Sequence, residues 1–266
     1  MNYWTELSVK YANQQDYLDK LFKVYPMAPN LRRIISDDKC NKIDNAFNER
    51  DNKQLVKELL KLELFPIKDS YVAYLKKDES AIERNPNTIN RLAGILYEMG
   101  LKEIYKKCTE PKETNRQIGP LFKRWINSGV LGAIVYNSEN EFLSNNENGI
   151  LNVSDNEMKN FAKKYLGYNR NKGLDFIARF NGKYIIGEAK FITDFGGHQN
   201  EQFDDAVSTI TSELLPSSIN AEVIKVAICD GVLYIKGNNK LYKHLENNED
   251  QIILSSLLLR EFLYSI

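Results

Sequence analysis

Three ionisable residues, Asp175, Glu188 and Lys190, are spaced so that their side chains could share one site. Glu188 and Lys190 are two positions apart in KYIIGEAK, and the period of two in a strand places them on the same face. Asp175 begins the preceding apolar stretch, and the intervening Asn181-Gly182 predicts a type I′ hairpin turn, in which both central residues need positive φ. Pairing of the stretches 174–180 and 183–190 would bring both carboxylates and the ammonium group to one edge of a sheet.

A surface ion pair is the alternative explanation, because charged residues near strand ends are common and contribute little to stability. Two features favour a functional site. The other residues of the second strand are mostly apolar, so these charges would lie beside a core, where they are costly. Gly187 and Ala189 flank Glu188 and leave room for a backbone or a ligand to approach.

Asp175, a strand-sized gap and Glu188-Ala189-Lys190 resemble the PD-(D/E)XK nuclease superfamily, whose pattern D…(D/E)-x-K lies on a β-hairpin. Leu174 stands where the superfamily usually has proline, a difference that removes no chemical group. The segments KGLDF, AKFITDFGGHQNEQF and NRQIGPLFKRW resemble a type II restriction endonuclease, and this closer resemblance covers Tyr71–Asp205. It implies an α/β fold in which helices flank a mixed central sheet, with a mainly helical N-terminal region.

The resemblance also implies a Mg²⁺-dependent endonuclease that cuts double-stranded DNA at a short specific sequence and leaves 5′-phosphate and 3′-hydroxyl ends. Asp175 and Glu188, with the carbonyl of Ala189, would hold Mg²⁺, which prefers oxygen ligands. Lys190 would orient the attacking water and stabilise the charge that develops on the phosphate. The predicted catalytic residues are therefore Asp175, Glu188 and Lys190.

The region around these residues is locally basic, although Lys+Arg and Asp+Glu are both 36 and the formal net charge is zero. Between residues 159 and 190 there are eight basic residues, opposed only by Asp175 and Glu188. A basic collar suits a polyanionic substrate, whereas an ordinary solvated helix face would explain part of it. The predicted phosphate contacts are Lys159, Arg170 and Lys172. The predicted base readers or partners of the site are Gln199, Asn200 and Gln202, for which a solvated helix start is an equal alternative.

The chain of 266 residues is expected to contain a helical N-terminal region, 1–112, and a catalytic domain, 113–266. The helical region could read DNA or pack as a bundle on the catalytic domain, and packing is the favoured interpretation. The patterns predict helices over 51–64, 70–77, 85–100, 117–128, 154–165, 198–215 and 251–266. They predict a strand over 222–229 with a hairpin partner over 232–236, and an irregular loop over 136–150. Glu157 completes a capping box with Ser154, which accounts for it without a metal-binding role.

Composition excludes several classes of protein. Three scattered cysteines and two histidines lack metal-ligand spacing, so a zinc site is not expected, and His198 is read as a polar contact. The polar start MNYWTELSVKY predicts no signal peptide, and the apolar segment ILSSLLLREFL is interrupted by Arg260, so no membrane span is expected. The sequence therefore predicts a cytoplasmic protein.

Two other functions remain open at this point: a structure-specific repair or junction nuclease, and a non-catalytic DNA-binding module on the same core. The non-catalytic module is disfavoured because Asp175, Glu188 and Lys190 are all present, whereas a site that has lost its activity should have lost at least one of them. A restriction enzyme would need a cognate DNA methyltransferase as its genetic partner. Cutting both strands of a symmetric site needs two active centres, so a homodimer is expected. The leucine-rich C-terminal segment or the N-terminal bundle could supply the interface.

Overall fold

The computed structural model describes residues 1–27, 32–111 and 115–266, and the chain divides into two compact units. One unit combines Met1–Met27 with Thr114–Ile266, and the other is Ala28–Glu113. The expected boundary between residues 112 and 113 lies outside the described residues. The first 27 residues were expected in the helical N-terminal region, but they belong to the unit that contains the central sheet. Val9, Leu21 and Val24 are buried in the same core as that sheet.

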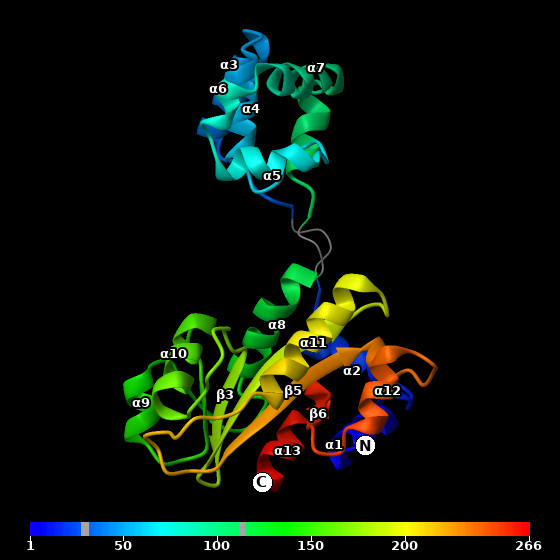
Figure 1. Ribbon diagram of the computed structural model, residues 1–266, viewed down its shortest axis with the longest axis vertical. Coiled ribbons are helices and arrows are strands. Elements are labelled where there is room, and N and C mark those ends of the chain that lie inside the picture. The colour runs from blue at the N-terminus through cyan, green and yellow to red at the C-terminus, as the bar shows by residue number, and fades with distance from the viewer. Residues whose placement is uncertain (28–31, 112–114) are drawn as a thin grey trace. The chain divides into compact units, whose positions relative to one another are not determined.

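The unit Ala28–Glu113 is helical and encloses a hydrophobic core of its own (Figure 1). Its helices are α3 (Asp37–Asn48), α4 (Asn52–Leu60), α5 (Ser70–Lys77), α6 (Ala81–Arg84) and α7 (Pro86–Cys108). The prediction that α7 stops at Gly100 is only half right. Gly100 has a φ of 73°, in the left-handed region that glycine tolerates, so the helix kinks there and a second helical stretch continues to Cys108.

The other unit is organised around a mixed sheet, which confirms the expected α/β fold. Its strands are β1 (Ile134–Tyr136), β2 (Gly149–Leu151), β3 (Phe176–Phe180), β4 (Lys183–Ile192), β5 (Val223–Gly231) and β6 (Ile253–Leu254). Among the described residues these six form one sheet in the order β1-β2-β3-β4-β5-β6. The pairs β1–β2, β4–β5 and β5–β6 are parallel, and the other two are antiparallel. The sheet is therefore mixed, as expected.

The predicted hairpin is formed by β3 and β4. Asn181 and Gly182 at the turn have φ of 49° and 79°, the two positive values that the sequence required. The register pairs Phe180 with Lys183 and Phe176 with Gly187. β4 then continues through α11 (Gly197–Thr211) to the parallel strand β5, so the predicted strand–helix–strand crossover is also confirmed.

Alternate side chains of β4 enter two different cores, as the strand period requires. Ile185 and Ala189 belong to the larger core, which also receives the N-terminal and C-terminal helices. Tyr184 and Ile186 belong to the smaller core, to which α10 (Asp155–Tyr165) contributes Phe161. Glu188 and Lys190 lie two and four positions after Ile186, so their side chains leave β4 on the same face as those of Tyr184 and Ile186. α11 contacts β4 and β5 and lies across them in Figure 1.

The remaining helices of this unit also lie around the sheet (Figure 1). They are α1 (Tyr3–Ala12), α2 (Tyr17–Val24), α8 (Asn115–Asn127), α9 (Glu139–Ser144), α12 (Lys240–Asn247) and α13 (Leu259–Ser265). α10 begins with the predicted capping box: Ser154 accepts the Glu157 N–H, and Glu157 accepts the Ser154 N–H at 2.9 Å. Glu157 thus has the structural role that its sequence context predicted.

The prediction of an irregular loop over 136–150 is wrong, because the segment forms α9 and β2 around an apolar anchor. Phe142 is fully buried, and the Ser138 hydroxyl caps the start of α9. The Arg179 guanidinium donates to the carbonyls of Phe142, at 2.7 Å, and Glu147, at 2.9 Å. Arg179 is therefore buried and does not belong to the expected basic collar.

Two elements near the C-terminus also differ from the predictions. The segment after Gly231 forms the 3₁₀ helix η1 (Val232–Tyr234) in place of a hairpin strand. β5 already has a parallel neighbour on each side, and the Tyr234 hydroxyl donates to the Cys229 carbonyl at 2.8 Å, folding the segment back.

The segment 251–266 forms β6, the 3₁₀ helix η2 (Ser256–Leu258) and α13 in place of one long helix. Leu259, Phe262 and Leu263 are buried in the larger core, so these apolar side chains are used for packing within the chain. In the part of the chain that the structure describes, no helix combines the length and the apolar character needed to cross a membrane.

Candidate active site

The structure brings Asp175, Glu188 and Lys190 together at the edge of the hairpin. Asp175 directly precedes β3, and its N–H donates to the Gly187 carbonyl at 3.1 Å, which extends the β3–β4 pairing by one residue. Its Oδ2 accepts the Ala189 N–H at 2.9 Å and lies 3.3 Å from Lys190 Nζ. Lys190 Nζ also donates to Glu188 Oε2 at 2.7 Å. The lysine therefore bridges the two carboxylates.

Glu188 is almost completely buried, with 1% of its surface exposed. Its two carboxylate oxygens have different surroundings. Oε2 faces the Lys190 ammonium, whereas Oε1 is buried and has no hydrogen-bond partner among the described residues. A buried carboxylate oxygen without a partner is costly in a folded protein, so this open oxygen indicates a place where a cation would bind.

The electrostatics of the site disfavour the charged form of Glu188 and favour the charged form of Lys190. Burial, together with the neighbouring charge of Asp175, raises the pKa of Glu188 to about 7 against the opposing effect of Lys190. Burial alone would lower the pKa of Lys190, but the charges of Asp175 and Glu188 outweigh it and raise that pKa. Lys190 is thus held as an ammonium group.

The space expected beside Gly187 is occupied by the neighbouring strand. A Cβ atom at Gly187 would lie 2.6 Å from the Val226 carbonyl oxygen, so glycine is required for the close approach of β4 and β5. This close packing fixes the strand on which Glu188 stands. The side chain of Ala189 points into the larger core, away from the row of Glu188 and Lys190.

Two further charged residues complete the cluster, and the sequence assigned a site role to only one of them. Lys172, which precedes β3, lies 2.6 Å from Asp205 Oδ2 and 3.6 Å from Glu188 Oε2. Asp205 stands on α11. Its partial burial raises its pKa, but the contact with Lys172 and the positive charges of Lys172, Lys190 and Arg170 together outweigh burial and lower it. The signal that could have identified Asp205 is its spacing of three from Gln202 and of six from Gln199, which puts it near the same face of the predicted helix 198–215.

The other predicted DNA contacts lie around α11. Arg170 donates to the Thr209 hydroxyl at 2.8 Å, and Gln199 is buried and accepts the Thr193 N–H at 3.0 Å. Asn200 has a buried Oδ1 without a hydrogen-bond partner in the described residues. Gln202 contacts the ring of His198 at 3.2 Å, which is the polar contact predicted for this histidine.

The donor set at Asp175 and Glu188 fits a hard divalent cation, which needs one or two carboxylates in addition to water and substrate oxygens. Glu188 Oε1 is the observation that supports this fit. A site made entirely of side chains is not present: among the described residues, no three or more His, Cys, Asp or Glu side chains are grouped so as to hold a metal ion.

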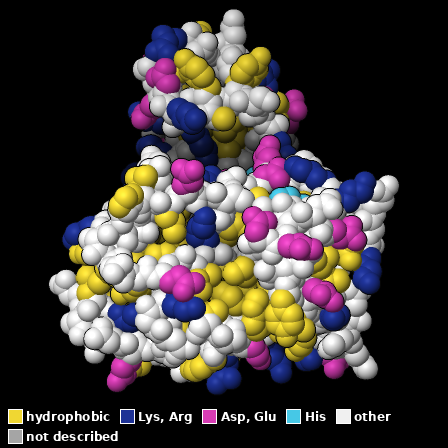
Figure 2. Space-filling view, turned by 60° about the horizontal axis from the view of Figure 1, so that its bottom comes forward, with side chains coloured by type: hydrophobic (Ala, Val, Ile, Leu, Met, Phe, Trp, Pro, Cys, Tyr) yellow, Lys and Arg dark blue, Asp and Glu magenta, His cyan; other side chains and the backbone are white. Residues whose placement is uncertain are grey.

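The expected basic collar is not a continuous basic surface. Acidic and basic side chains are interspersed over the sheet-containing unit on the face that Figure 2 shows. Lys164 lies 3.4 Å from Glu139, and Lys183 lies 3.1 Å from Glu222. The two basic residues at the site are also paired with carboxylates, Lys172 with Asp205 and Lys190 with Asp175 and Glu188.

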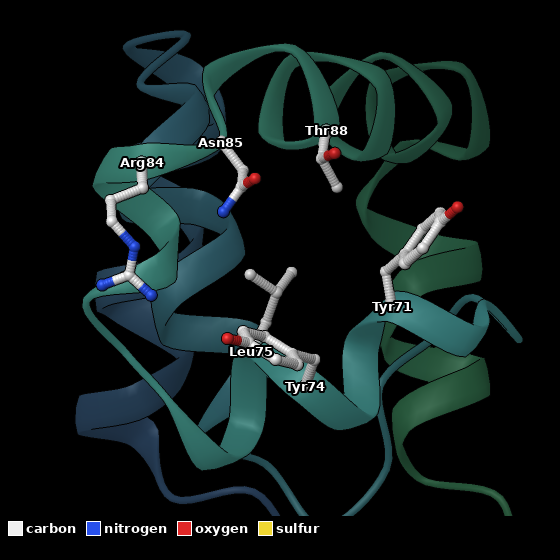
Figure 3. A pocket seen from close by; sticks show the side chains of 6 residues that line it. All are labelled: Tyr71, Tyr74, Leu75, Arg84, Asn85 and Thr88. Carbon is white, nitrogen blue, oxygen red and sulfur yellow. The ribbon is translucent and has the colours of Figure 1, made fainter.

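The helical unit has a separate hollow of about 490 Å³ between α5 and the start of α7 (Figure 3). Tyr71 and Tyr74 stand on α5 with 63% and 60% of their surface exposed. Asn85 and Thr88, at the start of α7, point toward them in Figure 3. The residues that line the hollow are Tyr71, Tyr74, Leu75, Arg84, Asn85 and Thr88.

A family model described as Tsp45I type II restriction enzyme matches residues 2–266, nearly the whole chain. No curated protein and no solved structure gives a significant match.

Proposed function

The chain belongs to the Tsp45I type II restriction enzyme family and is a site-specific deoxyribonuclease acting on double-stranded DNA, and we propose that Asp175, Glu188 and Lys190 are its catalytic residues. The observation that carries this proposal is the open, buried Glu188 Oε1 beside Asp175 and Lys190. Family membership favours this function over a junction nuclease or a non-catalytic DNA-binding module.

The proposed reaction is hydrolysis of a phosphodiester bond, which leaves 5′-phosphate and 3′-hydroxyl ends. Asp175 and Glu188, with the Ala189 carbonyl, would hold Mg²⁺, which supplies Lewis acidity toward the phosphate. Lys190, raised in pKa and fixed by both carboxylates, donates hydrogen bonds that orient the attacking water and stabilise the developing charge. The Asp175 carboxylate is itself fixed by the Ala189 N–H, so the site is largely preorganised.

The site is expected to make cleavage depend on pH at limiting Mg²⁺. Glu188 must be ionised to bind the cation, and its raised pKa of about 7 means that a proton competes with Mg²⁺ below that pH. Single-turnover rates should fall as the pH drops through about 7, and saturating Mg²⁺ should shift the midpoint to lower pH. A pH profile that is the same at low and saturating Mg²⁺ would contradict this assignment.

The same shift predicts a stability change in the metal-free protein. In the folded protein the pKa of Glu188 is raised above its ordinary value of 4.5. Its protonated side chain therefore makes its full contribution to the free energy of unfolding below about pH 4.5, where the folded and the unfolded chain both hold the proton. That contribution is lost as the pH rises through about 7, where the unfolded chain has already released the proton. Added Mg²⁺ should restore it.

The DNA contacts are proposed at the same edge of the sheet. We propose that Arg170 and Lys172 meet phosphates and that Asn200 and Gln202 reach bases or ordered water near them. Gln199 is buried and holds the segment after β4, so its proposed role is to support this edge.

The hollow of the helical unit is proposed as a second DNA contact that reads bases. Arginine and asparagine form the bidentate contacts that distinguish bases, and the hydroxyls of exposed tyrosines supply phosphate contacts. Arg84→Ala is expected to weaken cognate binding about tenfold and to leave non-cognate binding almost unchanged. Fluorescence anisotropy with Ca²⁺ measures both. Lys106→Ala is the matched control, because Lys106 pairs with Glu103 as Arg84 pairs with Asp78 but does not line the hollow. Equal losses on both DNAs would show that Arg84 binds phosphate only.

A homodimer is proposed because the described residues of one chain contain one such cluster, whereas a symmetric duplex site needs two. Leu18 and Phe22, on successive turns of α2, expose 70% and 61% of their surface, and we propose that they lie in the interface. Sedimentation should give a dimer on cognate DNA, and Leu18→Ser/Phe22→Ser should weaken it at least about tenfold. An enzyme that remains monomeric on DNA would contradict the dimer.

The proposed setting is the cytoplasm, with a cognate DNA methyltransferase as genetic partner. The free cysteines Cys40, Cys108 and Cys229 are compatible with a reducing compartment.

A further inference from the structure

Lys172 occupies an unusual position for a residue expected to reach out toward DNA. Its side chain is only 27% exposed, and its ammonium group lies between two carboxylates. Nζ is 2.6 Å from Asp205 Oδ2 on α11 and 3.6 Å from Glu188 Oε2 on β4. Asp205 therefore holds the ammonium against the carboxylate that we assign to the metal ion.

The two oxygens of Glu188 divide the site into two sides. Oε2 faces both ammonium groups, that of Lys190 at 2.7 Å and that of Lys172 at 3.6 Å. Oε1 faces neither and lacks a hydrogen-bond partner within the described chain. One side of this carboxylate is thus already supplied with positive charge by the protein, and one side remains for a cation.

The net charge of the cluster also favours one divalent ion over two. Asp175, Glu188 and Asp205 contribute three negative charges when ionised, and Lys172 and Lys190 contribute two positive charges. One divalent ion changes the net charge from −1 to +1, which matches a single phosphodiester. Two divalent ions would leave +3 in a partly buried site, where uncompensated charge is costly.

We propose that the Lys172 ammonium, held in place by Asp205, is a built-in second cation of the active site, so that each chain uses one divalent ion. In sites with two metal ions the second ion stabilises charge on an oxygen of the reacting phosphate. A lysine supplies a compact point charge that can do the same without a second ion. Asp205 is then a positioning residue. The inference rests on the proposed function, because it requires Asp175 and Glu188 to hold the first ion.

The test measures Mn²⁺ binding to the full-length protein without DNA, by electron paramagnetic resonance of free Mn²⁺. The wild-type protein should bind one Mn²⁺ per chain. Lys172→Ala should bind Mn²⁺ about tenfold more tightly, because a unit positive charge has been removed from beside a divalent ion. Asp205→Asn should bind it several-fold more weakly, because a negative charge has been removed. Damage to the fold would weaken binding in both variants, so opposite shifts are diagnostic.

Cleavage supplies a second measurement. Lys172→Ala should cut DNA at least about 100-fold more slowly at saturating metal, although it binds metal more tightly. Lys172→Met keeps the aliphatic stem and should behave in the same way. Lys183→Ala is the matched control, since Lys183, at the start of β4, pairs with Glu222 at 3.1 Å and should change neither quantity.

The outcomes separate this inference from the proposed function. Glu188→Gln should abolish Mn²⁺ binding, and if it does not, the proposed metal site is wrong. If Glu188→Gln does abolish binding, the inference is overturned by two Mn²⁺ ions per wild-type chain. It is also overturned if folded Lys172→Ala and Lys172→Met bind Mn²⁺ no more tightly than the wild type.

Discussion

Replacement of Glu188 by glutamine is expected to reduce cleavage of cognate DNA by at least about 10³-fold at saturating Mg²⁺. Glutamine has the same shape but cannot carry the charge that holds a divalent cation. Glu188 is buried and its Oε1 has no hydrogen-bond partner among the described residues, so the substitution removes the proposed ligand without breaking a hydrogen bond at that oxygen. Asp175→Asn and Lys190→Met should have losses of similar size, since Lys190 joins both carboxylates.

The measurement is a single-turnover digest of a plasmid followed by run-off sequencing, which also gives the recognition sequence and the cut position. Glu222→Gln is the matched control, because Glu222 is an exposed carboxylate that pairs with Lys183 at the start of β4. Binding in Ca²⁺ without cleavage should persist in the control and the wild type, because Ca²⁺ has flexible coordination and positions water poorly. Near wild-type cleavage by Glu188→Gln would remove this residue from the active site.

Replacement of Asp230 by alanine is expected to lower the free energy of unfolding by about 4 kcal/mol. Asp230 is completely buried at the end of β5, and its carboxylate accepts hydrogen bonds from three donors. The Tyr25 hydroxyl donates at 2.9 Å, the Ser255 hydroxyl at 2.5 Å and the Ser256 N–H at 3.3 Å. Alanine would leave all three donors buried without a partner.

This carboxyl group connects the N-terminal segment to the C-terminal one through the sheet. Its burial raises its pKa against the effect of the hydrogen bonds, so much of the desolvation cost is still present in the fold. Tyr25→Phe, which removes one donor and leaves the carboxylate, should cost only about 1 kcal/mol.

Denaturation can be followed in this unit alone, because both tryptophans, Trp4 and Trp125, belong to it. Fluorescence during urea unfolding therefore reports on the sheet and not on the helical unit. Asp250→Ala, at an exposed aspartate, is the control and should stay within about 0.5 kcal/mol of the wild type. If Asp230→Ala also stays within about 0.5 kcal/mol of the wild type, the buried network does not stabilise the fold.

The sequence alone determined those features that depend on neighbours along the chain. The period of two, the Asn181-Gly182 turn and the apolar strands placed Asp175, Glu188 and Lys190 together, and the register of β3 and β4 confirms it. The capping box at Ser154 and the crossover from β4 to β5 followed from equally local signals. Local patterns suffice here because a hairpin and a helix start each have geometry that is set within a few residues.

Only the tertiary structure decided which distant residues meet. Lys172 and Asp205 carry no pattern that pairs them, and α11 brings them together over Glu188. Arg179 looked like a surface charge and is instead buried among carbonyls, which turned an expected loop into α9 and β2.

The first 27 residues and the C-terminal segment were assigned by their shared core with the sheet, since Leu21 and Leu263 are buried in the same cluster. The physical reason is common to these cases. Hydrophobic burial and charge pairing depend on distance in space and not on separation in sequence, so a local pattern can show that a side chain needs a partner without showing which residue provides it.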